Sequence, residues 1–463
     1  MCRFKKPQDI VAAINGTHKQ QKYLIFRAAD PGKPAGVSLI SRSGLSHLDL
    51  HYSVDGAPFQ KWDGSQITIP IGGELRLFGN NDVFITDSHP EVRFVFDALI
   101  EADGFMSAIS KTCTFGYLFA GSDIVTTPYI DYTEVPKSGC LGMFENCTYL
   151  RTIRNFPNAV IGDSGMRKTF RGCSLLKYIP KRWDFVSSNY SSFDETFANS
   201  RITYIPYFQC SAEDFDLVFT KTFSGCTYIE DLEDVTLPSV FKNGKLTNPK
   251  FIYTFENCTN LRMPPSFEVL DYVFAYSMFA NSGLIEMPTL PATGTFDSMF
   301  QGCTGLIAAI LNFQTIKEGE TSCSAMFKGC TSISEVPDID VEEIGDFTCI
   351  EMFSGCSKIR TISIKTKEGV GSSALTGAFE NCTSLQRVLL DTPTIDRSEC
   401  ISSLFEGCTS LQTIEVTFTA WNDNASFNWV KGVAASGTFT KPESLTEEFG
   451  DSRIPTGWTV VNK

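Results

Sequence analysis

Sixteen cysteines are the residues of this sequence whose chemistry first needs an explanation. One of them, Cys330, follows a glycine in "MFKGCTSISEVP", residues 326–337, where a turn could present a reactive thiol. Nearly the same words recur as "MFENCTYLRTI" from Met143, "MFSGCSKIRTISI" from Met352 and "LFEGCTSLQTIEV" from Leu404. A word that is repeated this often is typical of a structural unit, so the repetition argues against a unique catalytic cysteine.

Three cysteine pairs with six residues between the partners could suggest a metal site: Cys140/Cys147, Cys323/Cys330 and Cys349/Cys356. On one helix, residues i and i+7 lie about 10 Å apart, which is too far for two sulfurs to share one zinc ion. We therefore expect a buried cysteine ladder that stays reduced and fills space as small apolar side chains. Disulfides between neighbouring coils remain open, because distance alone does not exclude them.

The four histidines are confined to the first part of the chain: His18, His47, His51 and His89. Composition thus excludes a histidine-based nucleophile, general base or zinc site within residues 101–463. His47 and His51 fall on one side of an expected strand in "HLDLHY" and could contribute to a metal or ligand site. The alternative is a solvated strand face, and we predict no metal and no cofactor.

Paired carboxylates and glycosylation sequons are the remaining candidates. Asp338/Asp340 and Glu342/Glu343 could resemble the two acids of a glycosidase, or could be solvated loop charges. The "NCT" sequons lie at Asn146, Asn257 and Asn381, where asparagine also suits a turn. There is no phosphate-binding or dinucleotide-binding glycine motif. The sequence therefore predicts a protein without enzymatic activity.

The bulk composition limits the classes of partner. The formal net charge is −14 with a pI near 4.9, and no run of basic residues is present. Phosphate backbones and anionic lipids need clustered Lys and Arg, so neither is expected as the main partner. No apolar stretch of about 18 residues occurs, and residues 1–22 lack the apolar run of a secretion signal. We expect either that the protein is made and released without a secretion signal, or that the signal was removed from this chain.

The elements that must position these residues form a repeat. Twelve units align on a phenylalanine: Phe119, Phe144, Phe170, Phe197, Phe223, Phe255, Phe279, Phe300, Phe327, Phe353, Phe379 and Phe405. Most intervals are 25 to 27 residues, with 32 from Phe223 to Phe255 and 21 from Phe279 to Phe300. This period is typical of a solenoid.

The pattern of residues in each unit predicts a helix, a turn and a strand. Apolar residues four and one before the phenylalanine, the phenylalanine itself and the cysteine three after it would share one face of a short helix. The Gly or Asn before the cysteine would end that helix. "IRTISI" (359–364) and "LQTIEV" (411–416) then read as strands that pair in parallel. Three units carry Ser122, Ser200 or Ser282 in place of cysteine, where a hydroxyl could reach a backbone partner.

The word "MFxGCTSLxxI" resembles the BspA-like leucine-rich repeat of bacterial surface proteins and of some phage and protist proteins. The resemblance covers roughly Phe115 to Val416. Together with the unit pattern, it implies an α+β solenoid of helix-turn-strand coils with a parallel sheet. The predicted organisation is a leader (1–22), a small all-β, sandwich-like domain (23–100), the repeats (101–417) and a C-terminal cap (418–463) in which Trp429 and Trp458 cover the final coil.

The function that this resemblance implies is non-enzymatic recognition or adhesion, directed at a host-cell or cell-surface protein or glycan. A phage virion component, such as a tail fibre or receptor-binding protein, is the first setting, and a bacterial cell-surface adhesin is the alternative. A glycan-binding or glycan-hydrolysing protein and a structural spacer, including a homo-oligomer, stay open. Binding is expected on solvent-facing strand positions and on loops such as residues 232–250, without any individual binding residue being identified.

Overall fold

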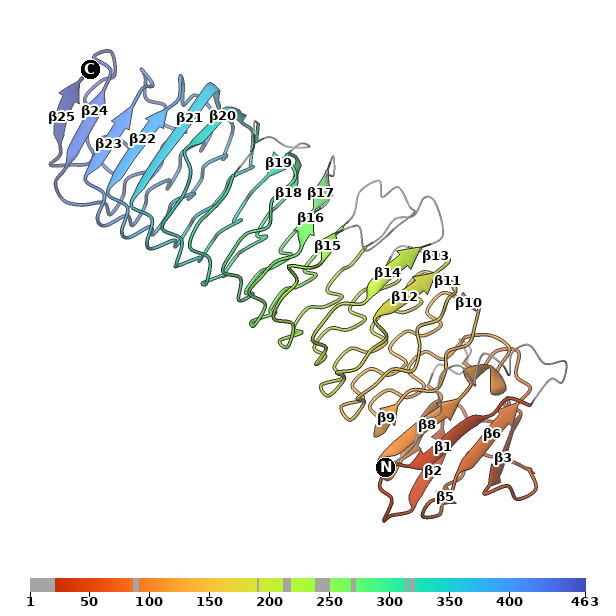
Figure 1. The fold of residues 1–463 in the computed structure, drawn as a ribbon. Helices are drawn as coiled ribbons and strands as arrows, with labels where there is room; N and C mark the ends of the chain where they lie inside the picture. Colours follow the sequence, from red (N-terminus) through yellow and green to blue (C-terminus); the bar gives the residue numbers. More distant parts are fainter. Residues whose placement is uncertain are drawn as a thin grey trace.

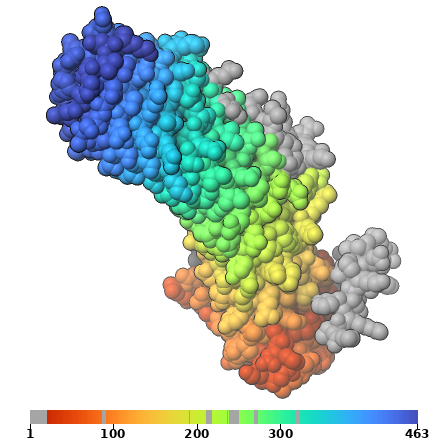
Figure 2. Space-filling view, turned by 60° about the vertical axis from the view of Figure 1, so that its left-hand side comes forward, coloured from red at the N-terminus to blue at the C-terminus, as the bar shows by residue number. Residues whose placement is uncertain are grey.

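The computed structural model is an elongated, gently curved body, in which an N-terminal block of strands continues into a stack of coils (Figure 1). The structure describes residues 21–85, 91–189, 191–210, 218–237, 250–267, 272–311, 313, 315–316 and 321–463. The sequence colours follow one another along the long axis in Figure 2, so each coil neighbours the coils before and after it. This one-dimensional stacking is the architecture of a solenoid.

The N-terminal block contains two sheets whose strands are antiparallel except for the pair β8–β9. The larger has the order β4-β3-β6-β1-β8-β9, with β1 (Leu24–Ala28), β3 (Leu50–Val54), β4 (Gln60–Lys61), β6 (Leu75–Gly79), β8 (Ile100–Gly104) and β9 (Ile124–Thr126). The smaller has the order β5-β2-β7, with β2 (Ala35–Ile40), β5 (Ile67–Ile69) and β7 (Arg93–Phe96). The ring centroids of Phe26 on β1 and Phe94 on β7 lie 5.0 Å apart, so the two sheets share a core.

The N-terminal block is joined to the coils without a break in the sheet. β8 pairs in parallel with β9, which belongs to the first coil. The ring of Phe26 lies 6.2 Å from that of Phe119, the first phenylalanine of the repeat. The division of the chain at residue 100 stays a prediction, since a continuous sheet and core cross that point.

The coils contribute short strands that pair in parallel. They are β10 (Glu134–Val135), β11 (Val160–Ile161), β12 (Arg182–Phe185), β13 (Ser187–Ser188), β14 (Tyr207–Cys210), β15 (Thr236–Leu237), β16 (Ser266–Phe267), β17 (Val273–Phe274), β18 (Gly294–Thr295) and β19 (Thr321–Ser322). The last sheet runs in sequence order through β20 (Ile339–Ile344), β21 (Thr361–Val370), β22 (Arg387–Asp391), β23 (Thr413–Val416), β24 (Thr438–Lys441) and β25 (Thr459–Asn462). The solenoid with a parallel sheet is confirmed.

The predicted helices are absent, so the α+β, helix-turn-strand assignment is wrong. Within the described ranges the one helical element is the 3₁₀ turn η1 (Met106–Ala108), and no helix is long and apolar enough to cross a membrane. In the second coil, residues 137–146 form consecutive turns instead. Ser138, Gly142 and Asn146 adopt φ of 56°, 56° and 58°, so every fourth residue is left-handed. A right-handed helix cannot continue through such residues.

The backbone hydrogen bonds of these turns explain why they stack. The Glu145 N–H donates to Gly142 O in its own coil at 2.9 Å, whereas the Phe144 N–H donates to Thr169 O of the next coil at 2.9 Å. Donors alternate in this way, so half of the turn backbone bonds the neighbouring coil. An α-helix would use every N–H internally and would leave the coils without these links.

The twelve repeat phenylalanines form one continuous column through the core. Each side chain is at most 2% exposed, and adjacent ring centroids lie 5.1 to 6.0 Å apart. Most of the pairs are stacked, as for Phe327 and Phe353 at 5.1 Å with an interplanar angle of 10°. The column fixes the spacing at which the coils present their outer side chains.

Candidate functional site

The cysteine of the repeated word lies in the core and donates its thiol to the preceding coil. Cys330 Sγ is 2.9 Å from Phe300 O, and Cys356 Sγ is 3.1 Å from Phe327 O. The same bond, 2.9 to 3.2 Å long, is made by Cys147, Cys173, Cys226, Cys258, Cys303, Cys382 and Cys408. Burial raises the pKa of the Cys330 thiol, and raises that of Cys356 to about 12. A protonated, buried thiol is a poor nucleophile, so this column serves packing and hydrogen bonding.

The serines that replace cysteine contact the same column. The hydroxyl of Ser282 lies 3.3 Å from Cys303 Sγ, and that of Ser200 lies 3.5 Å from Cys226 Sγ. Ser122 reaches the sulfur of the following coil in the same way, at 3.6 Å. The expected hydroxyl partner was a backbone group, and the structure shows the sulfur of the next coil instead. Each serine thus extends the polar column by one coil.

The paired cysteines belong to two different columns. Cys140 Sγ lies 3.4 Å from Cys113 Sγ, whereas Cys147 donates to Phe119 O at 2.9 Å. The helix on which their spacing was judged does not exist, yet the two sulfurs of this pair still face different neighbours. In the part of the chain that the structure describes, no group of three or more His, Cys, Asp or Glu residues is arranged to hold a metal ion.

The sequon asparagines occupy a position that the coil backbone requires. Asn146, Asn257 and Asn381 have φ of 58°, 60° and 58°, and all three are exposed. A Cβ added to Gly407 would lie 2.3 Å from Asn381 Oδ1, so the amide of one coil covers the glycine of the next. Asn and Gly tolerate the left-handed region best, which explains why either Asn or Gly precedes each ladder cysteine.

The histidines do not share one strand face. His51 lies on β3 and stacks on the ring of Phe78 at 5.0 Å, with its Nδ1 3.8 Å from Asp49 Oδ1. His47 precedes β3 and lies in a turn, so the predicted alternation along one strand is wrong. His18 and His89 lie outside the described residues, as does most of the 232–250 loop, of which residues 238–249 are not described.

The paired acids are separated by the pleat of β20. Asp340 and Glu342 are exposed, and Glu342 accepts a 2.8 Å hydrogen bond from Lys367 on β21. Glu343, in contrast, lines a polar hollow of about 490 Å³ at the carboxyl ends of β20 and β21. Asp338 is exposed just before the strand. The strand geometry therefore sends Glu342 and Glu343 to different surroundings.

The outer face of the last sheet is the most regular surface of the molecule. The register aligns one outward position of five successive strands: Thr361, Arg387, Thr413, Thr438 and Thr459. Inward neighbours such as Ile362 and Ile414 are buried, so the row is held by the core. Solvent-facing strand positions of this kind were expected to bind, but the sequence did not identify which residues share a row.

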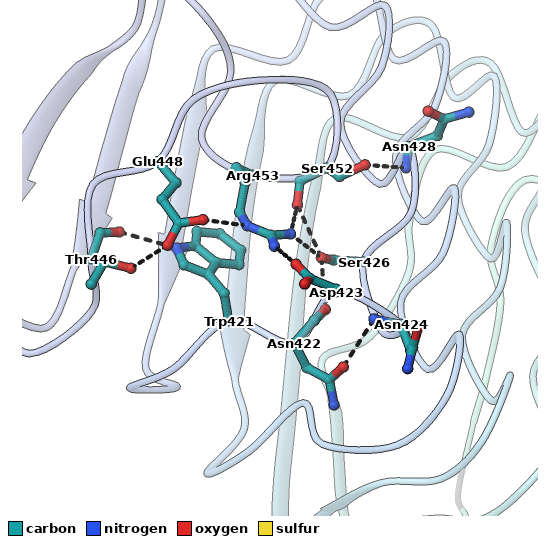
Figure 3. A network of polar contacts seen from close by, with 10 residues as sticks. All are labelled: Trp421, Asn422, Asp423, Asn424, Ser426, Asn428, Thr446, Glu448, Ser452 and Arg453. Carbon is teal, nitrogen blue, oxygen red and sulfur yellow. Dashed lines mark hydrogen bonds and ion pairs between the residues drawn. The ribbon is translucent and has the colours of Figure 1, made fainter.

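The C-terminal coils are closed by a network around Trp421 and Arg453 (Figure 3). The Arg453 guanidinium lies over the Trp421 ring, with Cζ 5.4 Å from its centroid, and pairs with Asp423 and with Glu448, the latter at 3.0 Å. The Trp421 indole donates to Thr446 O at 3.0 Å. Trp421 also lines a hollow of about 350 Å³ beside the polar one. Sequence reasoning named two other tryptophans and missed this one.

Trp429 and Trp458, the predicted cover, are buried against the last coils. Trp429 is 0% and Trp458 is 5% exposed. Their indoles donate to Arg453 O and Ala434 O at 2.9 and 2.7 Å. β24 and β25 prolong the sheet beyond the last repeat phenylalanine. The chain after residue 417 therefore adds strands to the solenoid and places tryptophans at its end.

Two comparisons with known proteins found matches. Residues 320–428 match the BspA type Leucine rich repeat region, in six copies. A leucine-rich repeat protein from Bacteroides ovatus ATCC 8483, known from a crystal structure, is 21% identical, with a TM-score of 0.48 over 75% of this chain and 86% of that chain. No curated protein matches the sequence. Residues 320–428 are therefore a BspA type leucine-rich repeat region.

Proposed function

We propose that this protein is a non-enzymatic recognition protein, which presents the outer surface of its solenoid to a receptor on a cell. The observation that supports the proposal is that the inner and the outer side chains of each coil have different roles. Phenylalanines and cysteines are held in internal columns, and outward strand positions such as Thr361 and Arg387 face the solvent. Such an arrangement offers an extended surface with fixed spacing, which is how solenoid proteins bind large partners.

The setting that we favour is a phage virion component, such as a tail fibre or receptor-binding protein. Its support is the cysteine column, because each ladder thiol is needed as a hydrogen-bond donor to the preceding coil. Reduced cysteines suit a protein that folds in a reducing cytoplasm. The alternative setting is the surface of a bacterial cell. Mass spectrometry of purified virions and of surface-shaved cells distinguishes the two settings.

The experiment that tests recognition is a binding assay of the fluorescently labelled full-length chain on a panel of bacterial and animal cells. We expect saturable binding to at least one cell type, which excess unlabelled protein abolishes. Treating the cells with protease or with glycosidases identifies the receptor as a protein or a glycan. Binding to no cell of the panel, or binding that unlabelled protein does not compete, would contradict the proposal.

A further inference from the structure

Exposed tyrosines are interspersed with basic side chains on the coils of the N-terminal half of the array. Tyr149, Tyr178 and Tyr228 are 42%, 61% and 44% exposed. Each follows the ladder cysteine of its coil by two to five residues, at the corner where the turns lead into the strand. Arg151 and Lys177 follow the ladder cysteine of their coils by four residues, and Arg201 directly follows Ser200 in the coil between those of Tyr178 and Tyr228. We call these six residues the basic-aromatic strip; their coils are yellow to yellow-green in Figure 1.

Contacts between adjacent coils link the strip in two places, from Arg151 to the coil of Tyr178 and from Arg201 to the coil of Tyr228. The N–H groups of Lys177 and Tyr178 both donate to Arg151 O of the preceding coil, at 3.2 and 3.1 Å. The ammonium of Lys177 lies 5.4 Å from the ring centroid of Tyr178. The guanidinium of Arg201 lies 4.6 Å from the ring centroid of Tyr228 on the following coil. Cations therefore border the tyrosine rings across successive coils.

Among the residues that the structure describes, the three cations of the strip, Arg151, Lys177 and Arg201, form no ion pair. Another arginine of the same coils, Arg171, pairs with Glu145 and Glu195 at 3.6 and 2.9 Å. The cations of the strip can thus pair with an external anion, while the exposed Glu230 and Asp231 add negative charge beside Tyr228.

The acidic character of the protein is concentrated in the other half of the chain. Residues 276–463 contain 12 Lys and Arg against 23 Asp and Glu, a net charge of −11, whereas residues 1–275 contain 27 against 30, a net charge of −3. The strip lies in the nearly neutral half. An anionic ligand would therefore be repelled by the C-terminal coils and directed toward the N-terminal ones.

We propose that the basic-aromatic strip binds an anionic polysaccharide, whose sugars carry carboxylate or sulfate groups. Tyrosine rings offer flat amphipathic platforms for the C–H faces of pyranose rings, and Arg and Lys pair with the anionic groups. The presence of tyrosines and cations on several coils suits a polymer. Nucleic acid fits less well, because its backbone carries one charge per roughly 1.7 Å of duplex and would meet only three cations on an acidic protein.

This assignment rests on the proposed recognition function and is tested on the purified full-length chain. The probes are polygalacturonate and chondroitin sulfate, with neutral dextran and single-stranded DNA as comparisons, and binding is measured by calorimetry. We expect binding to at least one polyanionic glycan, weaker binding at higher salt because the contacts are ionic, and no binding to dextran. Binding of DNA as tight as that of the glycans would overturn the assignment.

Variants locate the binding surface. Tyr178→Ala, and separately the double change Arg151→Ala and Lys177→Ala, should weaken glycan binding about tenfold or more, as expected for lost stacking and charge-assisted contacts. Lys358→Ala removes an exposed cation from a turn outside the strip and should leave affinity unchanged. Thermal melts verify that each variant is folded. Equal losses in the strip variants and in Lys358→Ala, or no loss in either strip variant, would refute the assignment.

The outcomes separate this inference from the function on which it rests. Saturable cell binding without glycan binding leaves recognition intact and removes the polysaccharide assignment. Glycan binding through the strip without binding to any cell supports the assignment and contradicts the recognition function. Loss of both activities in the strip variants supports both proposals and identifies the strip as the receptor site.

Discussion

The phenylalanine column makes a stability prediction at Phe327, which is 0% exposed. Its ring centroid lies 5.6 Å from that of Phe300 and 5.1 Å from that of Phe353. Phe327→Ala removes the ring from a filled site and should cost about 3–5 kcal/mol in the free energy of unfolding. Phe327→Leu keeps most of the volume and loses two ring pairs at about 0.5–1.5 kcal/mol each, a cost of about 1–3 kcal/mol.

The assay must measure the stability of individual coils, because a solenoid can unfold locally rather than in one step. Urea unfolding gives the overall order of stability, and hydrogen exchange followed by mass spectrometry assigns the loss to peptides. We expect Phe327→Ala to increase exchange in the coils that contain Phe300, Phe327 and Phe353. The N-terminal sheets should keep their protection, since they adjoin the first coils of the array, through β9 and the side chain of Arg154, and Phe327 lies many coils away.

A matched control tests whether burial in the column is the cause. Phe427 is 63% exposed, and Phe427→Ala should change the free energy of unfolding by no more than about 0.5 kcal/mol. Equal effects at Phe327 and Phe427 would refute the reasoning. So would a Leu variant at Phe327 that is as unstable as the Ala variant, because the cost would then not arise from the lost volume.

Three further predictions concern the other columns. Cys330→Ala removes the thiol donor to Phe300 O and should cost about 1–2 kcal/mol in urea unfolding, while Cys330→Ser keeps a donor, costs less and leaves cell binding intact; loss of binding with an unchanged melt would contradict the packing role. Gly407→Ala should cost more than Gly432→Ala, because both have φ of 75° but only the first adds a Cβ that meets Asn381; equal melting temperatures would count against the asparagine cover. Burial raises the pKa of the ladder thiols. The stability that these protonated thiols contribute is therefore complete below the pKa of an unfolded cysteine, about 8.5, and decreases as the pH rises above it. Melting temperatures that stay constant from pH 7 to about 11 would contradict the burial of the thiols.

The unit that contains Cys330 shows how much of the fold could be predicted from the sequence. The period, the buried phenylalanine and cysteine columns and the parallel strands follow from spacing, because each is a local pattern that repeats. The helix was wrong for a physical reason. Apolar residues separated by three and four positions also arise from successive turns in which every fourth residue is left-handed. Hydrogen bonds to the next coil decide between the two, and a single unit does not contain them.

By itself the sequence determined that this chain is a solenoid of coils with an apolar interior, since each unit repeats the same spacing of apolar residues. Its net charge of −14 argued against phosphate backbones and anionic lipids as the main partner. Only the tertiary structure brought Lys177 next to Arg151 of the preceding coil, and Arg201 next to Tyr228 of the following coil. The partners are 26 and 27 residues apart in the chain, so the sequence contains no basic run at these positions. Stacking converts that separation into contact between neighbours, and surface recognition depends on neighbours in space.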